Sequence, residues 1–151
     1  MLWKNKFELK VRIINRELGR INHLINQPAK PGDCGYDVFA TCNKTLLPHE
    51  RFNMPLGIAL EFTEGHFCQV NQKSGLANKF GIDTIGNVID SAYRGEIHAQ
   101  IVNTSNDVLK IDVGQKIAQL IFIPFVKANI EYVDELSKTE RGTDGFGSTG
   151  K

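Results

Sequence analysis

Apolar and polar residues alternate along several short segments of the chain. From Phe7 to Ile13, apolar side chains occupy every second position between charged ones, which is typical of a half-buried strand. The same period recurs further along, and the most continuously apolar segment is stopped by Pro124. The pattern predicts further strands over residues 36–41, 57–62, 66–70, 96–102, 117–123 and 130–133.

Turn-forming residues separate these segments at intervals of about ten residues, as in all-β sandwiches and barrels. Proline and glycine break the chain around 28–32, and closer apolar spacing over 18–25 predicts one short helix. Because strands do not alternate with long amphipathic helices, a parallel α/β fold is disfavoured. We expect one all-β domain over 1–136, followed by a flexible glycine-rich arm over 137–151.

The composition of the 151 residues narrows the choice of partners. Hydrophobic residues at 41% and charged residues at 23% are ordinary for a globular chain. A net charge of +1 lacks the basic excess that a nucleic-acid or membrane surface needs, so we expect neither partner. Since the sequence contains neither a membrane-length apolar run nor a secretion signal, we expect a soluble cytoplasmic protein.

The cysteines and histidines match no disulfide or zinc pattern. Cys34, Cys42 and Cys68 are odd in number and irregularly spaced, and none belongs to a C-x-x-C pair. The four histidines lie in no zinc-binding motif. We therefore expect reduced thiols and no zinc site.

The segment 144–151, DGFGSTGK, matches two phosphate-binding patterns at once. Gly145, Gly147 and Gly150 fit G-x-G-x-x-G, while Gly145, Gly150 and Lys151 fit the first part of a phosphate loop. Both motifs need a following helix, whose N-terminus supplies amide donors to the phosphates. Because Lys151 is the last residue of this sequence, we expect no such helix and favour another kind of phosphate contact.

Five polar, glycine-rich segments punctuate the chain in a definite order. They are 34–39 (CGYDVF), 71–77 (NQKSGLA), 86–97 (GNVIDSAYRGEI), 114–121 (GQKIAQLI) and 141–150 (RGTDGFGSTG). Together they resemble the five motifs of the trimeric dUTPases. Each motif is weak alone, but five in series are specific. The resemblance implies a jelly-roll β-barrel or sandwich that hydrolyses dUTP to dUMP and diphosphate with Mg²⁺ bound across the triphosphate.

The resemblance assigns the catalytic chemistry to two carboxylates and an amide. Asp90 corresponds to the general base that activates the water attacking the α-phosphorus. Asp37 corresponds to the acidic residue that holds Mg²⁺ through water, which suits an ion that keeps part of its hydration shell. Gln119 matches an amide that reaches the phosphates and the metal-bound water.

The second and third motifs are implied to bind phosphate and base. The resemblance implies that Lys73, Ser74 and Gly75 contact the phosphates. Lys73 replaces the usual arginine and lacks its planar guanidinium group. The third motif resembles a hairpin whose main chain reads the uracil edge, with Tyr93 packed under the deoxyribose. The implied base-binding residues are Thr84, Asn87, Val88, Ile89, Tyr93 and Ile97.

The last motif resembles an arm that closes over the nucleotide. Arg141 matches the arginine that clamps the γ-phosphate, and Phe146 the aromatic that covers the uracil. Gly147 and Ser148 would wrap the phosphates. The family builds its sites between the subunits of a homotrimer. Two alternatives stay open, a dUTPase-like nucleotide-binding regulatory protein and the related dCTP deaminase.

Overall fold

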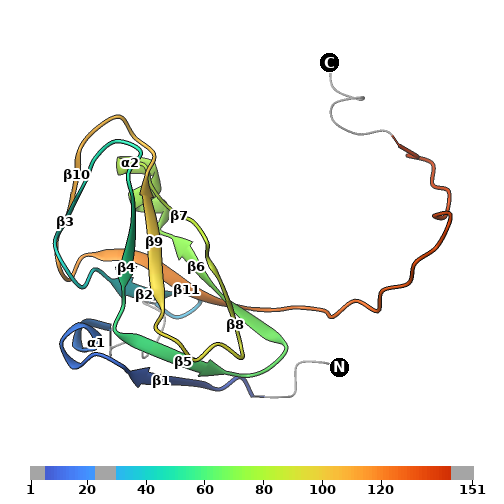
Figure 1. The fold of residues 1–151 in the computed structure, drawn as a ribbon, viewed down its shortest axis with the longest axis horizontal. Coiled ribbons are helices and arrows are strands. Elements are labelled where there is room, and N and C mark those ends of the chain that lie inside the picture. The colour runs from blue at the N-terminus through green and yellow to red at the C-terminus, as the bar shows by residue number, and fades with distance from the viewer. Residues whose placement is uncertain (1–5, 23–29, 144–151) are drawn as a thin grey trace.

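The computed structural model describes residues 6–22 and 30–143, which form an all-β fold with two short helices (Figure 1). The expected fold class is therefore confirmed. The strands are β1 Leu9–Ile13, β2 Tyr36–Phe39, β3 Lys44–Leu46, β4 Arg51–Pro55, β5 Ile58–Phe62, β6 His66–Gln72, β7 Ile82–Thr84, β8 Val88–Asp90, β9 His98–Asn103, β10 Leu109–Ile111 and β11 Lys116–Pro124, and the helices are α1 Arg16–Asn22 and α2 Ser74–Phe80.

The strands pair antiparallel, and in the described part of the chain they form four sheets. The largest has the order β2-β11-β6-β8, and a second has the order β4-β9-β7. Two two-stranded sheets, β1-β5 and β10-β3, complete the set. The sheets are arranged like a sandwich, and their inward side chains, among them Ile58, Ile101 and Leu120, form one buried core.

A β-bulge at the start of β11 changes the direction in which its polar side chains point. Lys116 pairs with Phe39 and Ala118 with Val38, so two residues of β11 face one of β2. Ile117 and Ala118 are both fully buried although they are adjacent. In a regular strand, residues three positions apart face opposite sides. The bulge instead brings Lys116 to the face that carries Gln119.

Helix α1, expected over 18–25, begins two residues earlier, at Arg16, and asparagines anchor it at residues 15 and 22, while residues 23–25 lie outside the described residues. The side-chain oxygen of Asn15 accepts hydrogen bonds from the main chain at the start of the helix, as an N-cap does. The amide of Asn22, fully buried, donates to the carbonyls of Phe39 and Leu56 at 3.2 Å each. It also accepts from the Phe39 N–H at 2.8 Å. Asn22 thereby ties α1 to β2.

The chain leaves the sheets after β11, and residues 125–143 extend away from the body of the fold (Figure 1). The strand expected over 130–133 is therefore wrong, because no neighbouring strand in the described chain reaches this segment to pair with it. Its side chains are exposed, with Ile130 at 74% and Tyr132 at 96%. Neither α1 nor α2 has the length and apolar character needed to cross a membrane.

Candidate functional site

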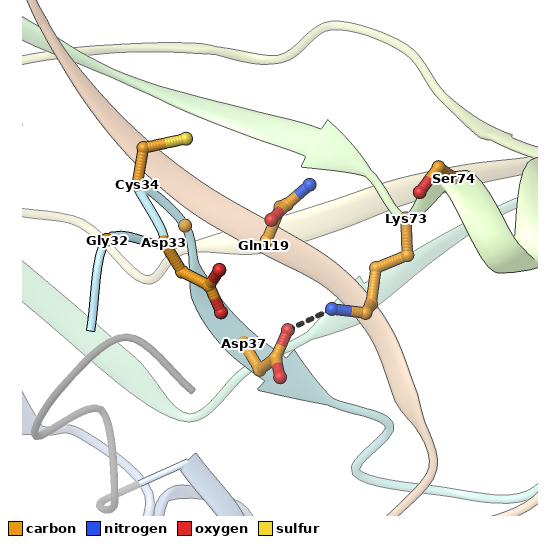
Figure 2. A pocket seen from close by; sticks show the side chains of 8 residues that line it. Gly32, Asp33, Cys34, Asp37, Lys73, Ser74 and Gln119 are labelled. Carbon is orange, nitrogen blue, oxygen red and sulfur yellow. Dashed lines mark hydrogen bonds and ion pairs between the residues drawn. The ribbon is translucent and has the colours of Figure 1, made fainter. Parts of the chain in front are cut away.

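A pocket of about 350 Å³ opens where three separate segments meet (Figure 2). The segments are β2 with the loop before it, the junction between β6 and α2, and β11. Such a volume is within the range of small-molecule sites. The lining residues are Gly32, Asp33, Cys34, Gly35, Asp37, Lys73, Ser74 and Gln119. Four residues predicted from three different motifs, namely Asp37, Lys73, Ser74 and Gln119, are thus brought together.

Asp37 lies in β2 with both carboxylate oxygens engaged by lysines. The Lys116 ammonium donates to Oδ2 at 2.7 Å, and the Lys73 ammonium donates to Oδ1, as Figure 2 shows for Lys73. The Asp37 side chain is only 11% exposed. Burial alone would raise the pKa of Asp37, but the hydrogen bonds and charges of Lys116 and Lys73 outweigh it and lower the pKa below its ordinary value. Asp37 therefore stays ionised.

Lys73 stands where the chain turns from β6 into α2. Its backbone is extended, with φ −95° and ψ 123°, and its carbonyl accepts the N–H of Leu76 at 2.9 Å to begin the helix. Ser74, the first helical residue, is exposed and lines the pocket. At Gly75, apart from its chain neighbours and the backbone of its own helix, no protein atom lies within 4 Å of the position that a Cβ would occupy. A ligand therefore has room to approach the backbone there.

Gln119 lies directly opposite Asp37 in the pairing of β11 with β2. Its Nε2 donates to the carbonyl of Gln72 at 3.0 Å, which fixes the orientation of the amide. On its other side the amide packs against Gly35, where any Cβ would overlap the Gln119 side chain. The glycine of the first motif thus makes space for the glutamine of the fourth.

Asp90 ends β8 and is exposed, and the turn after it is closely tied. The Tyr93 N–H donates to the Asp90 carbonyl at 3.0 Å, and the Tyr93 hydroxyl donates to the Glu96 carbonyl at 3.1 Å. The guanidinium of Arg94 donates to the Ser91 carbonyl at 2.6 Å. These bonds hold the carboxylate and the aromatic ring on one rigid turn.

The strand that leads to Asp90 carries three of the other residues predicted to bind the base. Asn87 precedes β8, and its carbonyl accepts the N–H of Val70 at 2.8 Å. Val88 is 61% exposed, whereas Ile89 packs partly against the core. This short strand pairs with β6 on one side only, and its other edge is open within the described chain. Its second edge can therefore receive a ligand.

Thr84 and Ile97, also predicted to bind the base, lie in the core instead. The Thr84 hydroxyl donates to the Val70 carbonyl at 3.1 Å. The Ile97 N–H donates to the Ile58 carbonyl at 2.8 Å, and the Ile97 carbonyl accepts from Leu56 at 3.0 Å. Both side chains are buried. These groups therefore stabilise the sheets, and neither residue lines the pocket around Asp37.

The strand register separates Asp90 from the pocket within one chain. Asp90 pairs with Phe67 of β6, whereas Gln119 pairs with Asn71 of β6 and with Asp37 of β2. Asp90 and Asp37 are therefore offset by four residues along the strands and by three strand spacings across the sheet. Together these offsets separate the two residues by about 20 Å. Asp90 and Asp37 therefore lie on the same face of the four-stranded sheet but in two separate regions of the surface.

Two findings concern residues outside the pocket lining. Arg141 lies on the exposed segment 125–143, while Phe146, Gly147 and Ser148 lie outside the described residues. Lys116, which sequence reasoning did not assign, reaches the carboxylate of Asp37. The sequence shows only that Lys116 lies three positions before Gln119. In a regular strand this spacing would place Lys116 on the face opposite to Gln119.

Comparisons with known proteins agree with the order of the motifs. Residues 22–150 match the family model described as dUTPase. The chain is 36% identical over 148 residues to the deoxyuridine 5'-triphosphate nucleotidohydrolase of Clostridium tetani, covering 97% of this chain and 99% of the relative. It is 39% identical over 146 residues to the protein of the same name from Nautilia profundicola, covering 95% and 99%.

Two solved structures show the same fold. A mutant dUTPase of Staphylococcus bacteriophage 80alpha with dUpNHpp superposes with a TM-score of 0.82 at 24% identity, covering 95% of this chain and 99% of that one. A mutant dUTPase from phage phi11 of S. aureus, described as revealing the coordination of a structural Mg(II) ion, gives a TM-score of 0.74 at 22% identity. It covers 87% of this chain and 99% of that one.

Proposed function

Since this chain belongs to the dUTPase family of hydrolases, we propose that it hydrolyses dUTP to dUMP and diphosphate between two of its surfaces. One surface is the pocket around Asp37 and the other is the turn around Asp90 and Tyr93. The observation that carries the proposal is the meeting of Asp37, Lys73, Ser74 and Gln119 in one pocket, although three sequence motifs supply them. The reaction would remove dUTP from the nucleotide pool and supply dUMP for dTMP synthesis.

The pocket is suited to the triphosphate. Lys73 brings a positive charge, Ser74 a hydroxyl donor and Gly75 an unobstructed backbone. Gln119 adds an amide whose orientation is fixed by Gln72. The Gln119 amide, held in place before the substrate arrives, would stabilise the charge that develops on phosphate oxygens in the transition state.

Asp37 fits the role of an anchor for Mg²⁺ through water. In residues 6–22 and 30–143 no cluster of three or more acidic, histidine or cysteine side chains could cage an ion directly. Two carboxylates, Asp37 and Asp33, line the pocket, and with so few protein ligands Mg²⁺ would keep several waters and take its other ligands from the substrate. When bound, the ion would neutralise charge on the phosphate oxygens.

Asp90 would act as the general base. Its exposed carboxylate would accept a proton from water as the water oxygen bonds to the α-phosphorus. The bond from the α-phosphorus to the bridging oxygen then breaks, and diphosphate leaves. The tied turn holds Asp90 in a fixed relation to Tyr93, whose ring would pack under the deoxyribose.

The Asp90→Asn variant tests this role. Loss of a general base typically lowers the rate roughly 10²–10⁴-fold. We expect kcat to fall by that factor while binding of a non-hydrolysable dUTP analogue stays within a few-fold of the parent. Because Asp90 is exposed at a strand end, stability should hardly change. Normal turnover by the variant would contradict the assignment.

The separation of the two surfaces supports a site shared between subunits. About 20 Å divides Asp90 from Asp37 along and across the sheet, too far for one nucleotide phosphate group to contact both. The exposed apolar side chains of the segment 125–143, such as Tyr132 and Leu136, would be buried by another copy. We therefore propose a homotrimer in which Arg141, Phe146, Gly147 and Ser148 of the arm close over the nucleotide.

Mixing two inactive variants tests the shared site directly. Asp37→Asn inactivates one surface and Asp90→Asn the other, so each pure variant should be inactive. After unfolding and refolding as an equal mixture, about a quarter of sites in a cyclic assembly would take an intact surface from each variant. Recovery of activity near that level would support sharing, whereas none would show that each site lies within one chain.

A substrate panel distinguishes this function from the two alternatives. We expect release of diphosphate from dUTP, with Mg²⁺, well above that from dCTP, dTTP or UTP. Release of ammonia from dCTP would favour a deaminase, and tight nucleotide binding without turnover would favour a regulatory protein. An intracellular site of action stays a prediction.

A further inference from the structure

The carboxylate of Asp37 lies between two ammonium groups that approach it from different strands. Lys116 comes from β11 and Lys73 from the end of β6, and each binds a separate oxygen. The trio carries one negative and two positive charges and is therefore cationic by itself, while Asp33 adds a second carboxylate to the pocket lining. The metal-binding role proposed for Asp37 does not explain why both oxygens are already occupied.

The two lysines oppose a free cation and favour a polyanion. A hydrated Mg²⁺ beside Asp37 would have to displace or face two ammonium groups, and like charges at such distances repel. A triphosphate brings several negative charges to the same place and attracts the lysines instead. The arrangement therefore discriminates between free metal and metal that arrives with a nucleotide.

We propose that Lys73 and Lys116 form a clamp that keeps Asp37 from binding free Mg²⁺, and that the triphosphate opens it by drawing the Lys73 ammonium onto its phosphates. This inference rests on the proposed function of the same pocket. It assigns Lys116 a role in controlling metal binding. Metal then binds together with the nucleotide or after it.

The two lysines have different parts in the clamp. Lys73 lies beside Ser74 in the pocket lining, on a flexible stem that can swing from the carboxylate to a phosphate. Lys116 is not a lining residue, and the β11 bulge directs it at the far oxygen of Asp37. Lys116 therefore holds the carboxylate in place while Lys73 moves.

The test measures metal binding without nucleotide. Mn²⁺ replaces Mg²⁺ in a titration of the full-length protein, and electron paramagnetic resonance measures the concentration of free Mn²⁺. We expect weak binding to the parent, and binding about tenfold tighter to Lys116→Met, since one half-exposed opposing charge is removed. Lys73→Met should tighten binding likewise. Adding Asp37→Asn to Lys116→Met should abolish the gain, which locates the metal at this carboxylate.

The matched control is Lys44→Met. Lys44 pairs with Glu50 at 2.6 Å, much as Lys116 pairs with Asp37, but outside the pocket. It should leave Mn²⁺ binding unchanged. The clamp is refuted if Lys116→Met and Lys73→Met, both folded by circular dichroism, bind Mn²⁺ no more tightly than the parent or the control.

A second arm adds a non-hydrolysable dUTP analogue to the parent protein. The ternary complex should bind Mn²⁺ more tightly than the analogue and the protein do separately, and Lys73→Met should reduce this cooperativity. Failure of the parent to hydrolyse dUTP would overturn the proposed function, whereas unchanged metal binding in the lysine variants of an active enzyme would overturn the clamp alone.

Discussion

Replacing Gly35 by alanine should disturb the pocket through a single collision. Gly35 is buried before β2, and an added Cβ would overlap the Oε1 and Cδ atoms of Gln119 and come close to its Cβ. The positive-φ glycines of the described chain do not include Gly35, so alanine can adopt the backbone there. The whole effect therefore comes from displacing the Gln119 side chain.

The loss of stability expected for Gly35→Ala has two contributions. Overpacking a filled site typically costs about 1–3 kcal/mol. Moving Gln119 also breaks its hydrogen bond to Gln72, which contributes about 0.5–1.5 kcal/mol. The unfolding free energy should fall by about 2–4 kcal/mol, which is less than the 5–15 kcal/mol of a typical domain. The variant should remain folded, with a displaced phosphate-binding amide and kcat/KM for dUTP lowered about 10²-fold.

Urea unfolding at fixed protein concentration and dUTP hydrolysis provide the two measurements. Adding Gln119→Ala to Gly35→Ala removes the collision, so the double variant should regain most of the stability but not the activity. The control is Gly75→Ala, where a Cβ meets no atom of the protein beyond its chain neighbours and its own helix backbone within 4 Å, and alanine favours the helix. Its stability should be equal or higher. An unchanged urea midpoint for Gly35→Ala would refute the reasoning.

Three further predictions address other parts of the molecule. Asn22→Ala should lower the unfolding free energy by about 2–4 kcal/mol in urea, because it leaves polar groups of Phe39 unpaired in the interior. Burial raises the pKa of Cys68 to about 12, so the thiol stays neutral in the folded protein above pH 9, where it ionises in the unfolded chain. The unfolding free energy should therefore be unaffected by this group below pH 9 and should fall by about 1 kcal/mol per pH unit above it. Cys68→Ala should flatten that slope. Deleting residues 141–151 should leave a folded protein that hydrolyses dUTP slowly, and full activity would refute the closing arm.

The longer strands could be predicted because their signal is local. Alternation over five or more residues marks β1, β5, β6 and β9 in the sequence itself, and a continuous apolar run marks β11; the strand β4 alternates only up to Pro55 and was missed. The three-residue strands β3, β7, β8 and β10 contain too little alternation to distinguish from turns. Helix α2 was missed because its first half, SGLA, belongs to the second motif, which was interpreted as a phosphate contact. The helix ends at Gly81 in the left-handed conformation, with φ 68°.

The residues that meet in the pocket could be anticipated from the motifs, but their contacts could not. Asp37 and Lys73 are separated by 36 positions, and only the sheet order brings them together. Lys116 depends on one extra residue inserted into β11 opposite β2. A bulge of this kind arises from pairing with a distant strand, so the sequence of β11 alone does not specify which face Lys116 joins.

The sheet order also constrains how the protein assembles. β2, which carries Asp37, and β8, which carries Asp90, are the two opposite edges of the four-stranded sheet. A site that needs both must place the β8 edge of one copy near the β2 edge of another, because strands inside one sheet cannot exchange places. Contact between unlike edges is head-to-tail, and repeated head-to-tail contacts close into a ring when the rotation allows. The proposed cyclic homotrimer satisfies this requirement, and it would make assembly a condition of catalysis.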